Sequence, residues 1–183
     1  MKYIFDFDDV LFYTTKHRKE HLIPFLEKLG ITRQKIDDFY GKARGDHFSM
    51  KKLFSHFALR REELYEAAMS EYEKFANIEL IDVIKTLGKD NCFIITYGDK
   101  DFQLEKIKRI GVDKLVSDII VVVNDEKKEL VEKFCNQYKN ETVLFIDDKI
   151  KHLENLDFTK CPNLKTIFYD EHGLEKLKAE IGV

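Results

Sequence analysis

The alternation of strand-like and helix-like segments constrains the fold more than any other feature of this sequence. Five short runs rich in β-branched and aromatic residues have the length of buried parallel strands, and they cover residues 2–7, 91–96, 118–123, 142–147 and 164–169. Apolar residues at helical spacing follow three of these runs, around Phe102, Leu130 and Leu174. Because strands that alternate with helices form a parallel sheet covered on both faces, we predict an α/β protein.

The segment between the first two runs breaks this alternation. It has no convincing strand, and its apolar stripes at helical spacing are Leu22, Phe25, Leu26 and Leu29, then Ile36, Phe39 and Tyr40, then Tyr65, Ala68, Met69 and Tyr72. Pro24, inside the first stripe, should kink that helix or mark its start. We predict a Rossmann-like three-layer core with a five-stranded parallel sheet, formed by residues 1–14 and 77–183, plus a small all-helical cap domain over residues 15–76.

Charge and cysteine content exclude several classes of protein. The net charge is only −3, and the basic residues are spread along the chain, so we expect no nucleic-acid partner. The three cysteines are odd in number and lack the spacing of zinc ligands, which fits a reduced cytoplasm. The longest apolar runs are too short to span a bilayer, and Asp6 comes too early for a signal peptide. We expect a cytoplasmic protein that binds a soluble molecule and no membrane; the sequence leaves its oligomeric state open.

Acidic residues gather where predicted strands end. Asp6 and Asp8 close the first run and point to the same side of an extended chain, and the pair 147–148 closes the fourth. Thr96 ends the second run, and residues 124–128 follow the third. One acidic turn would be unremarkable, but ligands bind outside the carboxyl ends of parallel strands. Because polar residues stand at four such strand ends, we predict a functional site at one edge of the sheet.

Electrostatics indicates what this site holds. Two carboxylates about 4 Å apart repel by about 4 kcal/mol at an effective dielectric constant of about 20. A cation would relieve this repulsion, and hard oxygen ligands suit Mg²⁺, which also binds substrate phosphate. The same ion would neutralise a phosphate that the carboxylates otherwise repel. The pattern therefore predicts a Mg²⁺ site that handles a phosphorylated small molecule.

Four motifs in this chain resemble those of the haloacid dehalogenase-like (HAD) hydrolase superfamily, whose members are mostly phosphatases. Residues 6–10 (DFDDV) match its Asp-x-Asp-x-Thr/Val motif, and residues 93–98 (FIITYG) match its strand that ends in Thr or Ser. Lys127 or Lys128 could supply its lysine near the start of a later helix, and residues 143–148 (VLFIDD) match its strand that ends in an acidic pair. The helical insert looks like the helical cap of that superfamily. The resemblance covers nearly the whole chain.

The resemblance implies roles for the carboxylates. Asp6 would be the nucleophile that forms an aspartyl-phosphate. Asp8 would protonate the leaving group and then activate water. Mg²⁺ would be held by Asp6, the backbone carbonyl of Asp8 and Asp148, with Asp147 nearby and Asp148 as the more direct ligand of that pair.

The resemblance also implies a phosphate-binding set. Thr96 would donate a hydrogen bond to a phosphoryl oxygen, with Gly98 beside it, although a buried Thr bonded to backbone is an equal alternative. A lysine would offset the charge on the transferring group. Lys127 is preferred over Lys128 because it shares a helical face with later apolar residues and should point inward.

This chain departs from the superfamily pattern at three places. Asp9 stands where many members have glycine, so we expect a different turn after Asp8. No proline follows the candidate lysines. His152 stands where many members have another acidic residue, and we expect it to support the site from outside or to lie on the surface.

Substrate choice should belong to the cap. Residues 40–47 (YGKARGDH) should connect two helices, and we favour a solvated connection there; the alternative is that Lys42, Arg44 and His47 reach a substrate over the site. The leading hypothesis is a phosphomonoesterase that acts on a small phosphorylated metabolite. The alternatives are a phosphotransferase or phosphomutase of sugar phosphates, and a non-catalytic phosphate-sensing protein. Dehalogenation is disfavoured because halide departure needs no acid such as Asp8.

Overall fold

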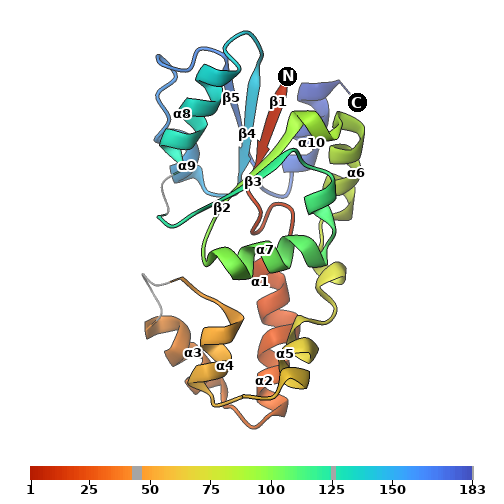
Figure 1. Ribbon diagram of the computed structural model, residues 1–183, viewed down its shortest axis with the longest axis vertical. Coiled ribbons are helices and arrows are strands. Elements are labelled where there is room, and N and C mark those ends of the chain that lie inside the picture. Colours follow the sequence, from red (N-terminus) through yellow and green to blue (C-terminus); the bar gives the residue numbers. More distant parts are fainter. Residues whose placement is uncertain (43–46, 125–126, 183) are drawn as a thin grey trace.

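A five-stranded parallel sheet forms the centre of the structure, a computed structural model that describes residues 1–42, 47–124 and 127–182 (Figure 1). Its strand order is β3-β2-β1-β4-β5. The strands are β1 (Lys2–Phe5), β2 (Cys92–Tyr97), β3 (Asp118–Val122), β4 (Val143–Asp147) and β5 (Leu164–Phe168). This confirms the predicted α/β fold and all five predicted strands. The first strand ends at Phe5, earlier than expected, because the chain turns back on itself after Phe7.

Helices cover both faces of the sheet. They are α6 (Ile78–Leu87), α7 (Lys100–Arg109), α8 (Lys128–Gln137), α9 (Ile150–Glu154) and α10 (Gly173–Ile181). Successive residues of a strand point to opposite faces, so Tyr3 and Phe5 pack in one apolar cluster with α6, α7 and α10, and Ile4 packs in a second with α8 and α9. Figure 1 shows α8 and α9 on one side of the sheet and α6 and α10 on the other.

Two of these helices, α6 and α9, were not expected from the sequence. The sequence does carry a signal for α6, since Asn77 and Gly88 are residues that favour the two ends of a helix. In the structure the Asn77 side chain accepts a hydrogen bond from Leu80 N, and Gly88 ends the helix with φ 82°. Helix α9 has only five residues, too few to show a helical period.

The segment between β1 and α6 is helical, as predicted. It contains α1 (Thr14–His17), a π-helical turn (Arg18–Leu22), α2 (Ile23–Lys28), α3 (Arg33–Lys42), α4 (Met50–His56), α5 (Glu62–Met69) and a 3₁₀ turn (Tyr72–Phe75). These helices lie beyond one end of the sheet in Figure 1. The two connections to the core are hydrogen-bonded to each other, from Tyr13 N to Phe75 O at 2.9 Å and from Asn77 N to Leu11 O at 2.9 Å. The domain boundaries at residues 14/15 and 76/77 stay a prediction.

Pro24 lies in the first turn of α2, directly after the π-helical turn. Proline has no amide hydrogen to donate to the preceding turn, so the helical hydrogen-bond register changes there. Leu22 and Leu26 of the predicted stripe are buried, whereas Leu29 is 38% exposed at the end of the helix. No helix in the described parts of the chain is long and apolar enough to cross a membrane.

Aromatic side chains join the helical segment to the core. The Phe12 ring lies 5.8 Å from Phe7 and 4.9 Å from Tyr72, measured between centroids. The His17 ring lies 4.5 Å from Tyr72 and 5.0 Å from Phe75. Burial, followed by the charges of His21 and Lys106, lowers the pKa of His17 to about 4. This imidazole is therefore neutral in the folded protein at neutral pH.

We predict that His17 makes the fold sensitive to mild acid. Its pKa is about 6.5 when unfolded and about 4 when folded, so the unfolded state binds the proton first and stability is lost as the pH falls below about 6.5. At pH 5 the loss from this group should be about 2 kcal/mol relative to pH 7.5. Urea unfolding at both pH values measures it. His17→Phe should reduce the pH dependence by this amount, and an unchanged pH dependence in that variant would contradict the assignment.

Candidate active site

Two carboxylates and one ammonium group are buried together at the carboxyl edge of the sheet. Asp6 directly follows β1 and Asp147 ends β4, and these strands pair with Phe5 opposite Ile146. Lys127 Nζ lies 2.7 Å from Asp6 Oδ2 and 2.7 Å from Asp147 Oδ2. All three side chains are at most 3% exposed. The neighbouring strands thus place the carboxylates side by side, and Lys127 bridges them.

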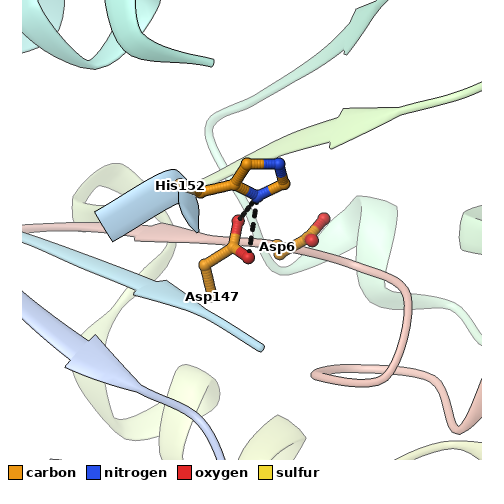
Figure 2. A group of neighbouring side chains, drawn as sticks. All are labelled: Asp6, Asp147 and His152. Carbon is orange, nitrogen blue, oxygen red and sulfur yellow. Dashed lines mark hydrogen bonds and ion pairs between the residues drawn. The ribbon is translucent and has the colours of Figure 1, made fainter. Parts of the chain in front are cut away.

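The carboxylate of Asp147 is fully engaged by protein donors. Besides Lys127, it accepts hydrogen bonds from Lys149 N at 2.8 Å and from His152 Nδ1, which lies 2.9 Å from each oxygen. Figure 2 shows the His152 ring, carried by α9, above this carboxylate. Burial alone would raise the pKa of Asp147, but the hydrogen bond from His152 and the charge of Lys127 outweigh it and lower that pKa. His152 is thus a buried support of the site.

Asp6 is held in one orientation. Its Oδ1 accepts a hydrogen bond from Phe7 N at 2.6 Å, while its Oδ2 faces Lys127. Burial raises the pKa of Asp6 and the Asp147 charge adds to this, with Lys127 acting in the opposite direction. The carboxylate is therefore desolvated and fixed, as a nucleophile requires.

Asp148 differs from its neighbour because one of its oxygens has no donor. Oδ1 is buried and lacks a hydrogen-bond partner within the parts of the chain that the structure describes. Burial, then the charges of Asp6 and Asp147, raises the pKa of Asp148 to about 6. An under-compensated oxygen beside Asp6 fits a hard cation such as Mg²⁺. Asp6, Asp147 and His152 also offer atoms within 4.8 Å of one another, but Asp147 and His152 Nδ1 already bind each other.

Asp8 faces a different set of donors. Its carboxylate accepts hydrogen bonds from Lys106 Nζ, from Thr14 Oγ1 and, at 2.7 Å, from Gln103 Nε2. Burial would raise the pKa of Asp8, but the charge of Lys106 and these hydrogen bonds outweigh it and lower that pKa. Lys106 and Gln103 were not singled out from the sequence. The signal for Lys106 was its helical spacing from Phe102, which places both on the buried face of α7.

Asp9 adopts the backbone conformation for which glycine is favoured. Its φ is 57°, and its carboxylate accepts hydrogen bonds from Thr15 N at 2.9 Å and Thr15 Oγ1 at 2.7 Å. Aspartate tolerates the left-handed region better than most residues because its short side chain bonds locally. The turn after Asp8 thus forms without glycine.

Thr96 lies near the end of β2, and Gly98 directly follows that strand. Thr96 is 1% exposed, and its Oγ1 has no hydrogen-bond partner among the described residues, so the alternative of a backbone-bonded Thr is not realised. Gly98 has φ 147°, and a Cβ there would lie 2.7 Å from Gln103 Nε2. Glycine is therefore required for Gln103 to approach both Asp8 and the Tyr97 carbonyl.

The two candidate lysines have different surroundings. Lys127 is buried against Asp6 and Asp147, whereas the Lys128 side chain is 45% exposed and lies 3.8 Å from Glu132. Of the predicted cap residues, Arg44 lies outside the described residues, Lys42 is exposed, and His47 lines a cavity beside Asp8. The structure thus groups Asp6, Lys127 and the pair 147–148 at one site, while their catalytic roles stay predictions.

Solved structures share this fold. A protein of Burkholderia xenovorans described as a haloacid dehalogenase-like hydrolase matches with TM-score 0.69 and 16% identity over 96% of this chain and 85% of its own. A Bacillus subtilis HAD hydrolase, bound to magnesium, matches with TM-score 0.60 and 17% identity over 100% of this chain and 98% of its own. A Thermotoga maritima protein described as a beta-phosphoglucomutase matches with TM-score 0.56 and 17% identity over 98% of this chain and 99% of its own. No protein-family model and no curated protein sequence matches the chain. The chain therefore has the HAD-like fold, which confirms the predicted fold class.

We predict that Lys127 is required for stability when no divalent cation is present. Lys127→Met would leave Asp6 and Asp147 buried without their shared counter-charge, and breaking a buried pair costs about 3–5 kcal/mol. Urea unfolding in EDTA measures this loss. Lys128→Met is the matched control and should change the unfolding free energy by less than about 0.5 kcal/mol. Equal effects of the two substitutions would contradict the stabilising role of Lys127 between Asp6 and Asp147.

We predict that Asp148→Asn separates stability from metal binding. In EDTA at pH 7.5 the variant should be more stable than the wild type by about 1 kcal/mol, because it removes an ionised carboxylate from beside Asp6. Added Mg²⁺ should raise the melting temperature of the wild type and have little effect on the variant. Thermal unfolding with and without Mg²⁺ tests both, and an equal Mg²⁺ response in the two proteins would exclude Asp148 as a ligand.

Proposed function

We propose that the protein is a Mg²⁺-dependent phosphohydrolase of the cytoplasm that cleaves the phosphate monoester of a small soluble metabolite through a phosphorylated Asp6. One observation carries the proposal: Asp6 is fixed by Phe7 N and Lys127 at the edge of the sheet where β2 and β4 end, and two buried oxygens at the ends of those strands, Oγ1 of Thr96 and Oδ1 of Asp148, have no partner among the described residues. This set offers a nucleophile, a cation ligand and a hydrogen-bond donor at the edge of the sheet where ligands bind.

Asp6 would attack the phosphorus atom of the substrate. A carboxylate oxygen forms a bond to phosphorus as the bond to the ester oxygen breaks, which leaves an acyl phosphate on Asp6 and releases an alcohol. The hydrogen bond from Phe7 N and the contact with Lys127 hold the carboxylate in place, so little orientational freedom is lost in the transition state.

Two side chains from distant parts of the chain would hold the transferring phosphoryl group. Lys127 Nζ supplies positive charge and Thr96 Oγ1 a hydroxyl donor, and the absence of a side chain at Gly98 leaves room beside them. Mg²⁺ would be held by Asp6, Asp148 and the backbone carbonyl of Asp8, and would neutralise the phosphoryl oxygens. The similar Bacillus subtilis structure bound to magnesium supports this part of the proposal.

Asp8 would handle protons on the opposite side of the reacting phosphorus. Its three donors keep it ionised, which suits the second step, in which it takes a proton from the water that hydrolyses the acyl phosphate. The first step requires that Asp8 give a proton to the leaving oxygen. For that role Asp8 must be protonated, and the neighbouring charge of Lys106 opposes its protonation. The geometry therefore supports the base role of Asp8 more directly than its acid role.

A phosphomutase is the second candidate, favoured by the similarity to the Thermotoga maritima protein described as a beta-phosphoglucomutase. A mutase would use the same acyl phosphate and pass the phosphoryl group to a sugar hydroxyl in place of water. Phosphorylated protein chased with water or with a sugar monophosphate distinguishes the two, because only a mutase forms a sugar bisphosphate.

We predict that Asp6→Asn abolishes Mg²⁺-dependent phosphate release from a generic aryl phosphate, by at least about 10³-fold, because an amide cannot attack phosphorus. Asp82→Asn, at an exposed position of α6, is the matched control and should retain full activity. Circular dichroism checks that both variants fold. Activity retained in Asp6→Asn would exclude Asp6 as the nucleophile, and beryllofluoride binding without turnover of any phosphate ester would favour a phosphate-sensing protein.

A further inference from the structure

A cavity of about 320 Å³ lies between the core and the helical segment, where α7 faces α1 (Figure 1). The core contributes Asp8, Gly98 and Lys106 to its wall. Asp8 is two residues from the proposed nucleophile, and in the proposed function it contacts the leaving oxygen. The cavity therefore lies where the alcohol part of the substrate would be.

Aromatic rings make up much of the cavity wall. They are Phe12, Tyr40, Phe48, Tyr72, Tyr97 and Phe102. They pack on one another: Tyr40 stacks on Phe48 at 5.3 Å, Phe48 meets Phe102 edge-on at 5.6 Å, and Phe12 stacks on Tyr72 at 4.9 Å between centroids. The rings therefore support each other and form a wall before any ligand arrives.

The two charged groups of the core in this wall, Asp8 and Lys106, are already paired with each other. Both oxygens of Asp8 accept hydrogen bonds from Thr14, Gln103 and Lys106. The Lys106 ammonium also lies 5.2 Å from the Phe102 ring centroid, and the Arg18 guanidinium lies 4.9 Å from that of Tyr40. Among the described residues, His17 Nε2 and Gln103 Oε1 are buried atoms of the wall without a hydrogen-bond partner, so a polyol such as a sugar would regain only part of the hydrogen bonds that it loses to water. A flat ring would instead gain apolar contact and ring stacking.

We infer that this cavity binds the leaving group of the substrate and that this group carries a flat aromatic or heteroaromatic ring; the inference rests on the proposed function, which puts the leaving oxygen at Asp8. The volume suits one or two fused rings, since a cavity of about 150 Å³ holds one benzene molecule. The substrate class is thus the phosphate monoester of an aromatic or arylmethyl alcohol.

The test compares two phosphate esters that differ only in ring flatness, benzyl phosphate and cyclohexylmethyl phosphate, whose leaving alcohols have similar reactivity. With Mg²⁺, benzyl phosphate should have a kcat/KM about tenfold higher, as expected from one or two ring contacts. The kcat/KM for benzyl phosphate should also exceed the kcat/KM for ribose 5-phosphate by at least about tenfold. A kcat/KM for ribose 5-phosphate or cyclohexylmethyl phosphate equal to or above that of benzyl phosphate would overturn the inference.

Two phenylalanines of the helical segment give a matched pair of variants. Phe48 lines the cavity, whereas Phe57 is similarly half-buried and packs on Phe39 and His56 instead. Phe48→Leu should reduce the benzyl preference to below about threefold, and Phe57→Leu should leave it unchanged. An equal loss of preference in both variants would contradict ring stacking in the cavity.

Acetyl phosphate, which has no ring, separates this inference from the proposed function. Hydrolysis of acetyl phosphate without any benzyl preference would refute the inference and leave the proposed function standing. If no ester is hydrolysed, the proposed function fails. Calorimetric titration with benzylphosphonate and cyclohexylmethylphosphonate then tests the ring preference of the cavity alone: tighter binding of the benzyl compound supports an aromatic ligand, and equal or absent binding refutes it.

Discussion

The bridge from Lys127 to Asp6 and Asp147 is the interaction on which the rest of the site depends. The pairing of β1 with β4 forces the two carboxylates together in a buried place, and an uncompensated buried charge costs several kcal/mol. Lys127 compensates both, and His152 and Lys149 N complete the shell of Asp147. Asp148 is outside this shell, so it is the carboxylate at this edge whose Oδ1 has no donor among the described residues.

The carboxylates of Asp6 and Asp8 are two residues apart but have opposite surroundings. Asp6 is desolvated beside Asp147, and burial raises its pKa, whereas Asp8 meets Lys106 from α7 and has its pKa lowered. Paired carboxylates acquire distinct tasks when their environments separate their proton affinities. Here burial and the charge of Asp147 raise the pKa of Asp6 against the opposing effect of Lys127, whereas Lys106 on α7 lowers the pKa of Asp8.

The parts of the structure that local patterns encode were predictable. Buried parallel strands read as apolar runs, so all five strands were found, and the inward face of α8 favoured Lys127 over Lys128. The contact of Lys106 with Asp8 spans 98 positions in the sequence, and a lone lysine is solvated by default, so no local signal revealed it. The donors that lower the pKa of Asp8 also come from distant segments, so its surroundings could not be predicted from its neighbours in the sequence.

In the proposed function, Asp8 would connect the chemistry with substrate choice. It lies two residues after the proposed nucleophile and lines the aromatic cavity, and Lys106 and Gln103 of α7 fix its carboxylate. A ligand in the cavity therefore contacts the rings that surround the Lys106 ammonium as well as the carboxylate itself. Aryl oxygens depart with less need for a proton than alkyl oxygens, because their negative charge is delocalised into the ring. An ionised Asp8 is thus consistent with an aryl ester in the cavity, whereas the oxygen of an arylmethyl ester would still need a proton as it departs.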